Sequence, residues 1–238
     1  MPLPSLMERT IARAYALTYH GIVNGFPPYE RLLDEIAALV ARSRPADATT
    51  GRLKVLDVSC GIGTVAVRLA RDGHSVVGLD GVERLVTAAR ERTRGDDSID
   101  VSFHHMDLVD GPIPGAGTYD VVVSMHTLYW HPNPTAVLAA CRRAIRPGGH
   151  AVFLTYARQA RVRRIFAEIR RTEGVGAATQ ALRWLVPTAL FERFRDCDHL
   201  YLDEAAFHAR LRAADFDVLE SHRAFLAGIS LIAWGRRR

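Results

Sequence analysis

Short apolar runs and stretches of helical spacing alternate along the middle of the chain. Apolar runs over residues 53–58, 75–79, 99–106, 119–124 and 151–155 predict strands. Residues 64–71, 82–92 and 133–145 have the spacing of helices. Gly73 ends the first of these helices, and Asn133 and Pro134 supply the N-cap and first residue of the last. Strands that alternate with helices indicate a parallel sheet covered on both faces.

The two ends of the chain depart from this alternation. Residues 1–44 predict helices with a break at 24–28, because Pro27 and Pro28 lack the backbone N–H that a continuous helix needs. Residues 157–200 predict Arg-rich helices, and the chain then returns to the core pattern. There it predicts a helix near 204–213 and strands near 216–221 and 228–234, whose short link favours an antiparallel pair.

These patterns predict one structural domain with four parts. We expect an N-terminal helical cap over residues 1–50 and a ligand-binding core over 51–156. A helical lid or substrate insert follows over 157–200, and an αββ segment over 201–238 completes the core sheet.

Composition narrows the class of protein. Hydrophobic residues make up 48% and charged residues 24% of the 238 residues, as in ordinary globular proteins. No apolar run reaches the roughly 20 residues of a membrane helix. Glu8 and Arg9 stand where a signal peptide needs apolar residues, so we expect a cytoplasmic protein without a membrane partner.

Net charge and the cysteines say less about the class of protein than the composition does. The net charge of +5 is weak evidence for a nucleic-acid partner, and the arginines of residues 158–195 fit either a solvated helical face or an anion-attracting rim. Cys60, Cys141 and Cys197 lie far apart without a CxxC pair, which predicts reduced thiols and no metal site.

The most informative stretch is VLDVSCGIGT at residues 55–64, where a strand runs into a glycine turn that opens a helix. Gly61 and Gly63 let backbone approach a ligand closely. Residues 61–66 alone also fit a dinucleotide fingerprint, with Asp80 about 20 residues further on. Asp57 argues against that class, because a carboxylate repels the pyrophosphate expected at this turn. S-adenosylmethionine has no phosphate and brings an ammonium and a sulfonium, which an acid favours.

Further acids follow the next two predicted strands. Asp80 is placed to take the two ribose hydroxyls of such a ligand, and Asp107 to accept from an adenine amino group. Val82 and Met106 are placed to sandwich the adenine ring. The carboxyl ends of successive parallel strands meet in one crevice, where open α/β sheets bind their ligands.

With these residues the sequence resembles the class I, seven-stranded, Rossmann-like S-adenosylmethionine-dependent methyltransferases of the small-molecule type. The segments VLDVSCGIG, VVGLD, HHMDL, YDVVVSMHTLYW and RRAIRPGGHAVF are similar to the five motifs of that family, in order, over residues 51–156. The resemblance implies an α/β fold with a mostly parallel seven-stranded sheet, helices on both faces and one antiparallel C-terminal strand. It implies S-adenosylmethionine as cofactor and S-adenosylhomocysteine as product.

One departure from the family pattern stands in the glycine turn. Ser59 occupies the first glycine position of D-x-G-x-G-x-G, so we expect slightly altered turn geometry with binding retained. The residues expected to bind the cofactor are Asp57, Ser59, Gly61, Gly63, Asp80, Gly81, Val82, Met106, Asp107, Leu108, Ser124 and Tyr15.

The segment after the fourth predicted strand should lie over the sulfonium if the resemblance holds. The candidate catalytic residues are His126, His131, Tyr129 and, from the N-terminal segment, Tyr19. Each histidine is a candidate base, or else a structural, hydrogen-bonded imidazole. Tyr129 and Trp130 are placed to stack on a substrate, although core packing is an equal reading of Trp130. Tyr15 and Tyr19 are four residues apart and share a helix face.

The predicted function is methyl transfer to a small-molecule acceptor by in-line displacement. The arginines of residues 157–200 suggest an anionic group on that acceptor. Three alternatives stay open: an enzyme that consumes S-adenosylmethionine by internal cyclisation and releases methylthioadenosine, an RNA methyltransferase, and an NAD(P) enzyme, which Asp57 disfavours. We expect a monomer or homodimer without a nucleic-acid partner.

Overall fold

Seven strands form one mixed sheet in the computed structural model, which describes residues 24–44, 51–109, 111–193 and 200–238. The strand order is β3-β2-β1-β4-β5-β7-β6. Neighbouring strands from β3 to β5 are parallel, and β7 is antiparallel to both β5 and β6. The strands are β1 (Lys54–Val58), β2 (Ser75–Asp80), β3 (Asp100–His105), β4 (Tyr119–Met125), β5 (Ile145–Tyr156), β6 (Phe216–Ala224) and β7 (Ser230–Arg237). The predicted fold class is confirmed.

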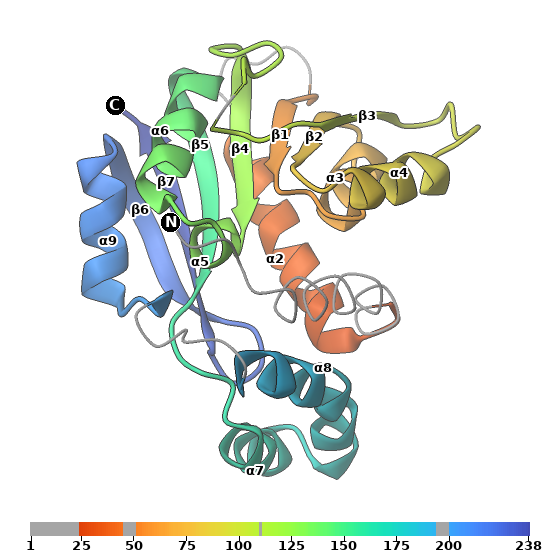
Figure 1. Cartoon of the computed structure of the whole chain (residues 1–238), viewed down its shortest axis with the longest axis vertical. Helices are drawn as coiled ribbons and strands as arrows, with labels where there is room; N and C mark the ends of the chain where they lie inside the picture. The colour runs from red at the N-terminus through yellow and green to blue at the C-terminus, as the bar shows by residue number, and fades with distance from the viewer. Residues whose placement is uncertain (1–23, 45–50, 110, 194–199) are drawn as a thin grey trace.

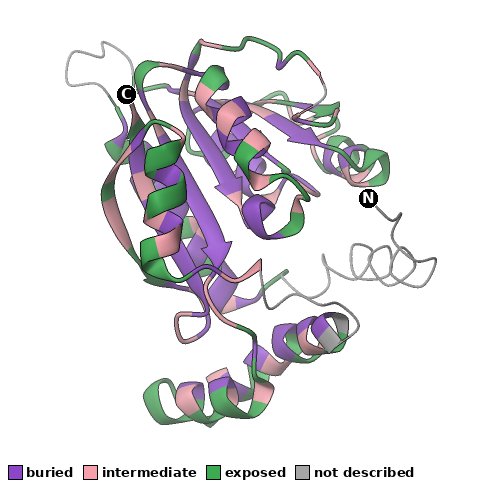
Figure 2. Ribbon diagram, turned by 60° about the vertical axis from the view of Figure 1, so that its left-hand side comes forward, coloured by how far each residue is buried: buried purple, intermediate pink, exposed green. Residues whose placement is uncertain are grey.

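Helices cover both faces of this sheet (Figure 1). The described helices are α2 (Pro27–Arg42), α3 (Thr64–Arg71), α4 (Glu83–Arg92), α5 (Thr127–Trp130), α6 (Pro134–Ala144), α7 (Val162–Thr172), α8 (Val175–Arg193) and α9 (Glu204–Ala213). One core cluster joins α2, α3 and α4 to one face, and a second joins α6 and α9 to the other. Figure 2 shows buried strands between helices whose outer sides are exposed. The buried strands explain why their sequences are nearly continuous apolar runs.

Local sequence signals fix several helix boundaries. The Asn133 side chain accepts a hydrogen bond from the backbone N–H of Ala136 at 3.0 Å, so it caps α6 as predicted. Pro27 and Pro28 open α2, where their missing N–H groups cost nothing. The predicted turn at 147–149 lies instead within β5, at a register shift against β4 between Tyr119 and Val121.

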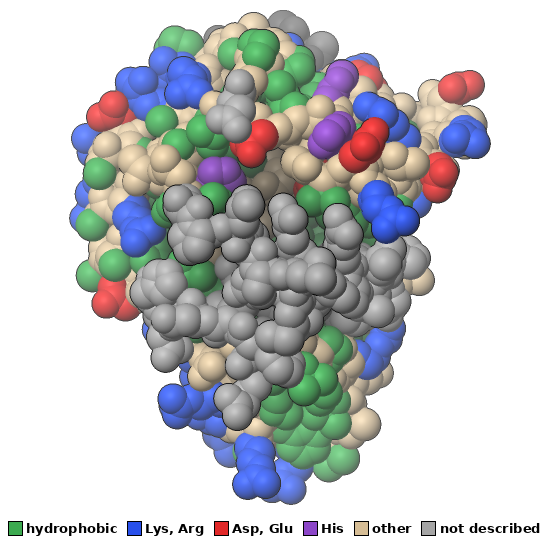
Figure 3. Space-filling view, in the orientation of Figure 1, with side chains coloured by type: hydrophobic (Ala, Val, Ile, Leu, Met, Phe, Trp, Pro, Cys, Tyr) green, Lys and Arg blue, Asp and Glu red, His purple; other side chains and the backbone are tan. Residues whose placement is uncertain are grey.

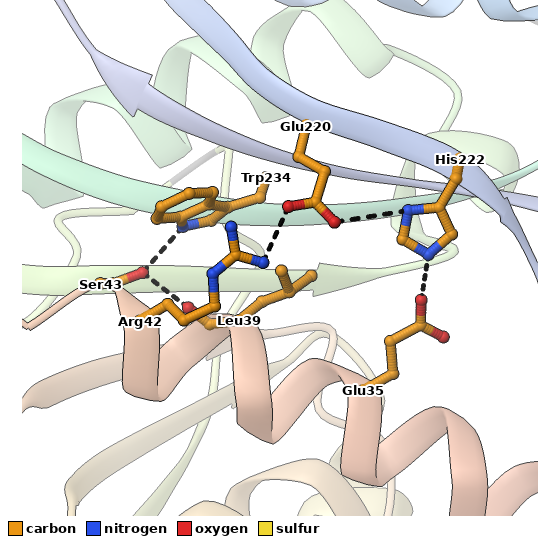
Figure 4. Close-up of polar contacts among 7 residues, drawn as sticks. All are labelled: Glu35, Leu39, Arg42, Ser43, Glu220, His222 and Trp234. Atoms are coloured by element: carbon orange, nitrogen blue, oxygen red, sulfur yellow. Dashed lines mark hydrogen bonds and ion pairs between the residues drawn. The ribbon is translucent and has the colours of Figure 1, made fainter.

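Polar contacts fix the C-terminal end of α2 to the strands of the closing segment (Figure 4). They join Trp234 Nε1 to Ser43 Oγ at 2.9 Å, Arg42 to Glu220 at 2.8 Å, and His222 to Glu35. The same helix brings Tyr29, in its first turn, to the pocket described below.

Phe103 of β3 packs where two glycines leave room for it. A Cβ on Gly63 would lie 2.6 Å from Cζ of Phe103, and a Cβ on Gly78 would lie 2.6 Å from its Cδ1. The ring is 4% exposed, so the glycine turn rests on a filled core.

The insert of α7 and α8 lies beyond the end of the sheet to which β4 points (Figure 1). Trp184 and Leu185 of α8 and Ile165 and Ile169 of α7 are buried. The arginines of α7 are exposed, and basic side chains gather at this end of the molecule in Figure 3. The predicted cap is described only from residue 24 to residue 44.

The described residues hold two free cysteines, Cys60 and Cys141, both buried. Cys197 lies outside the described residues. Within the described part of the chain, no group of three or more His, Cys, Asp or Glu side chains is arranged to hold a metal ion. No helix there has the length and apolar character that crossing a membrane requires.

Candidate active site

A pocket of about 410 Å³ opens at the carboxyl ends of β1, β2 and β4. One half is built around the glycine turn, and its lining includes Asp57, Ser59, Gly61, Asp80, Gly81, Val82, Met106, Asp107 and Leu108. The other half is lined by Tyr29, Met125, His126, Thr127, Trp130, His131, Pro132 and Tyr156. Asp57, Asp80 and Asp107 therefore lie at one pocket, as the sequence predicts.

The glycine turn runs through three left-handed residues. Ser59 has φ 56°, Gly61 φ 56° and Gly63 φ 76°. Ser59 thus takes the left-handed conformation that a glycine adopts freely, at a cost of roughly 1–2 kcal/mol. A Cβ on Gly61 would meet nothing within 4 Å, whereas one on Gly63 would meet Phe103. Gly61 therefore keeps space open in the pocket, and Gly63 serves packing.

Asp80 ties the end of β2 to the glycine turn. Its Oδ2 accepts from the N–H of Gly61 and its Oδ1 from the N–H of Val82, both at 2.8 Å. The side chain is 8% exposed, and burial raises the pKa of the carboxyl above its ordinary value, against the two backbone hydrogen bonds that lower it. Each carboxylate oxygen keeps a further lone pair for a ligand hydroxyl.

Asp57 is more deeply buried, at 1% exposed. Its Oδ2 accepts from the N–H of Ala66 at 3.1 Å, in the first turn of α3. Burial raises the pKa of Asp57 to about 8. The sequence predicts a negative charge on Asp57. In the folded chain the neutral acid is favoured near pH 7, because its pKa is about 8. A positive group beside Asp57 would favour the ionised carboxylate.

Asp107 lies at the outer edge of the pocket with about half of its side chain exposed. Its Oδ1 accepts from the N–H of Val109 at 2.9 Å and lies 3.8 Å from Nε2 of His131. Met106 precedes it, and Val82 stands 50% exposed at the same pocket. Two apolar side chains beside an acid form a surface that suits a flat, amino-bearing ring.

His126 follows β4 in the left-handed conformation, with φ 60°. Its ring stacks on that of Tyr156 with centroids 3.9 Å apart, and its Nε2 lies 3.0 Å from Ser230 Oγ. Burial lowers the pKa of His126 to about 3, so the imidazole is neutral at physiological pH. With this pKa, the His126 imidazole is a weak base.

The other residues of this segment divide between pocket and core. His131 lines the pocket, and its Nδ1 lies 3.0 Å from the backbone nitrogen of Asn133. Trp130 lines the pocket with 38% of its surface exposed. Tyr129 is 1% exposed and lies outside the lining, where its hydroxyl donates to Tyr201 at 3.3 Å.

Ser124 is fully buried in β4 and also lies outside the lining. Tyr15 and Tyr19 fall outside the described residues. The structure adds Tyr29, Met125, Thr127 and Tyr156, which sequence reasoning did not select. Met125 and Tyr156 are the last residues of β4 and β5, so the rule that ligands bind at the carboxyl ends of parallel strands would have found them.

Comparison with known proteins decides the family. A family model described as "Methyltransferase domain" matches residues 27–221, more than half of the chain. The chain belongs to the methyltransferase-domain family. Its glycine turn, the three acids and the aromatic half of the pocket all lie within the matched residues.

Curated relatives match part of this methyltransferase domain. The ubiquinone biosynthesis O-methyltransferase of Cronobacter sakazakii is 37% identical over 109 residues, which are 45% of this chain and 44% of that protein. The enzyme of the same name from Acinetobacter baylyi is 33% identical over 102 residues, 43% of each chain. The chain thus spans less than half the length of these relatives.

Solved structures match the methyltransferase domain over nearly its whole length. The magnesium protoporphyrin IX methyltransferase of Synechocystis PCC 6803, determined with S-adenosylhomocysteine, has a TM-score of 0.65 at 18% identity and covers 97% of this chain and 100% of that one. The N-methyltransferase NodS of Bradyrhizobium japonicum, also with S-adenosylhomocysteine, has a TM-score of 0.64 at 17% identity and covers 97% of each chain. At these identities the likeness shows the fold.

Proposed function

We propose that this protein transfers a methyl group from S-adenosylmethionine to a small molecule. The observation that carries the proposal is the set of three acids, Asp57, Asp80 and Asp107, at one pocket beside the open glycine turn. S-adenosylmethionine needs hydrogen-bond acceptors for its ribose hydroxyls at one end and for its ammonium group at the other. A pyrophosphate has no cationic partner among the described lining residues.

The residues present fit this cofactor. Asp80 would hold the ribose hydroxyls, and Asp107 the adenine amino group between Val82, Met106 and Leu108. The space that Gly61 keeps open would take the methionine portion, with Asp57 and Ser59 beside its ammonium. Bound there, the cofactor supplies a methyl group already activated by the sulfonium charge.

The remaining work of the protein is to orient the acceptor and exclude water. Tyr29, Trp130 and Tyr156 supply aromatic surface to the same pocket. Both histidines line the pocket, and we propose His131 as the base for an acceptor that arrives protonated, because burial lowers the pKa of His126 to about 3 and makes it a weak base. Tyr129 supports the rings of Trp130 and Tyr156 from behind. A role for Tyr15 and Tyr19 stays a prediction, as do Gly63, Gly81 and Ser124 as cofactor contacts.

Three features support a small-molecule acceptor. The pocket volume of about 410 Å³ is that of a small-molecule site. The names of a curated relative and of a structural neighbour refer to ubiquinone biosynthesis and to magnesium protoporphyrin IX. The exposed arginines of α7 do not line the pocket, so the basic residues that suggested a nucleic-acid partner lie away from the proposed site of methyl transfer. A monomer or homodimer in the cytoplasm remains our expectation.

Two measurements test the proposal. Calorimetric titration should show micromolar binding of S-adenosylhomocysteine and no comparable binding of NAD; the reverse result would refute it. With extracts or compound libraries as acceptor source, mass spectrometry should find S-adenosylhomocysteine as the nucleoside product. Methylthioadenosine in its place would indicate internal cyclisation, and product formed only with added RNA would indicate an RNA methyltransferase.

A further inference from the structure

Three contacts hold His126 at the pocket, directly after β4. Its backbone N–H donates to the carbonyl of Leu154 at 2.7 Å, and its ring stacks on Tyr156 at an interplanar angle of 11°. Its Nε2 lies 3.0 Å from Ser230 Oγ. The left-handed backbone, with φ 60°, is unfavourable for a residue with a side chain. Such strain persists where the surrounding structure determines it, and it gathers at functional sites.

The hydroxyl of Ser230 determines which nitrogen of His126 carries the proton. Ser230 is fully buried in β7, and within the described part of the chain the hydrogen-bond partner of its Oγ is Nε2 of His126. A buried hydroxyl that finds no acceptor is costly, so the Ser230 O–H donates to Nε2. A neutral imidazole nitrogen that accepts a hydrogen bond carries no proton of its own.

The His126 ring therefore carries its proton on Nδ1. Burial lowers the pKa of His126 to about 3, so near pH 7 the ring is neutral and has one N–H. Among the described residues no hydrogen bond reaches Nδ1, and this atom is not one of the fully buried polar atoms left without a partner. Because His126 lines the pocket, its Nδ1–H is open to the pocket as a hydrogen-bond donor.

This donor lies beside the end of β1. The strand order places β4 next to β1 and away from β2 and β3. Thr127, the next residue, donates from Oγ1 to the backbone carbonyl of Val58 at 3.2 Å. Val58 stands between Asp57 and Ser59, the two residues proposed to lie beside the cofactor ammonium. The carboxylate of the same amino-acid portion suits an N–H donor here, since hydrogen bonds to charged groups are the stronger ones.

We infer that Ser230 holds His126 as the Nδ1–H tautomer and that this N–H donates to the carboxylate of the bound cofactor. Ser230 is then a positioning residue, and His126 binds the ligand without acting as a base. The tautomer follows from contacts within the chain alone, whereas the carboxylate as its acceptor rests on the proposed function. Separate measurements test the two.

Nitrogen-15 NMR of the whole chain with labelled histidine reads the tautomer at pH 7 without ligand. The His126 signals, identified by their loss in His126→Phe, should show a protonated Nδ1 and an unprotonated Nε2. Ser230→Ala should move the Nε2 resonance, because that nitrogen loses its donor. Ser221→Ala is the matched control and should leave it in place, since Ser221 Oγ is buried on β6 without a partner in the described structure. A protonated Nε2 in the wild type, or an Nε2 resonance unmoved by Ser230→Ala, would overturn the inference.

Calorimetry with two probes tests the carboxylate. His126→Phe keeps a ring to stack on Tyr156 but lacks the N–H. It should raise the dissociation constant of S-adenosylhomocysteine about tenfold or more and leave that of methylthioadenosine, which has no carboxylate, within about twofold. His150→Phe is the control and should change neither, because His150 stacks on Trp234 and does not line the pocket.

Equal changes for the two probes in His126→Phe, or no change for either, would reject the carboxylate as acceptor. A wild type that binds neither probe would instead reject the proposed function, and the tautomer measured without ligand would stand.

Discussion

The hydroxyl of Tyr201 donates a hydrogen bond to Oε1 of Glu192 at 2.6 Å and joins the end of α8 to the wall of the pocket. Tyr201 accepts in turn from Tyr129 at 3.3 Å, and the ring of Tyr129 meets the edges of Trp130 and Tyr156. Burial and the carboxylate of Glu192 raise the pKa of Tyr201, so the phenol keeps its proton. The insert is therefore connected to the aromatic lining of the pocket through three hydrogen-bonding side chains, Glu192, Tyr201 and Tyr129.

Tyr201→Phe should lower the free energy of unfolding by about 1–3 kcal/mol, because the buried Glu192 carboxylate loses a donor. The affinity for S-adenosylhomocysteine should stay that of the wild type, because neither Tyr201 nor Glu192 lines the pocket. Tyr119→Phe is the control, since its hydroxyl donates to Pro114 away from the pocket. That control loses a hydrogen bond to a backbone carbonyl and not to a carboxylate, so it should lose less stability, about 0.5–1.5 kcal/mol. Urea unfolding measures both variants, and a Tyr201→Phe protein as stable as the wild type would contradict the expected cost of the lost hydrogen bond.

Asp80→Ala should cost about 2–3 kcal/mol of S-adenosylhomocysteine binding, because two charge-assisted bonds to hydroxyls are lost. This corresponds to a dissociation constant raised about 30- to 150-fold in calorimetry. Asp100→Ala, on the neighbouring strand and paired with Arg52 at the surface, should leave affinity unchanged. A change below about 0.5 kcal/mol for Asp80→Ala would show that Asp80 is not the ribose ligand.

Ser59→Gly should raise stability by about 0.5–1 kcal/mol. The substitution removes the left-handed strain at φ 56°, which is roughly 1–2 kcal/mol. Part of this gain is offset, because glycine gives the unfolded chain more backbone entropy to lose on folding. Ser59→Ala keeps the strain and serves as control. Thermal or urea unfolding of the three proteins decides the matter, and a glycine variant no more stable than the alanine one would contradict the assignment of strain.

The buried carboxyl of Asp57 should make stability fall as pH rises. Its folded pKa of about 8 lies above the ordinary value of 3.8, so between these values the folded chain holds more protons than the unfolded one. The contribution is fully present below about pH 4 and is lost as the pH rises through about 8, with a slope of up to about 1.4 kcal/mol per pH unit. Urea unfolding of wild type and Asp57→Asn over this range measures it.

The neutral His126 acts in the opposite direction below pH 6.5, but it is present in both proteins and cancels in the difference. A flat difference between wild type and Asp57→Asn from pH 4 to 8 would show that Asp57 is ionised in the free protein.

Binding of S-adenosylhomocysteine should release protons near pH 7, because its ammonium beside Asp57 favours the ionised carboxyl. The calorimetric binding enthalpy should then vary with the ionisation enthalpy of the buffer. Asp57→Asn should remove this dependence. Identical enthalpies in phosphate and Tris for the wild type would place the ammonium away from Asp57.

Local sequence patterns predict most of the helices and strands. The helix predicted at 204–213 has those bounds in the structure, and the strands around the glycine turn agree within a residue or two, because buried runs and caps are local signals. The acids at 57, 80 and 107 were found for the same reason, since each ends a readable strand.

The aromatic lining of the pocket was harder to predict from sequence. Tyr156 and His126 lie 30 residues apart in sequence and meet only through β4–β5 pairing, and Ser230 reaches His126 from β7. Tyr129 and Trp130 are adjacent on a four-residue helix, too short for a periodicity that would assign one to the core and the other to the pocket. The lowered pKa of His126 depends on those long-range contacts.

The ring of Phe103 under two glycines limits how this chain can evolve. A methyl group added at Gly63 or at Gly78 would meet the same ring at 2.6 Å, so each substitution is costly while Phe103 is present. A smaller side chain at 103 would open the space that either alanine needs, although Gly63 would still have to bear a positive φ. The three positions, one on each of three elements, should therefore change together among descendants of this sequence, with effects that do not add.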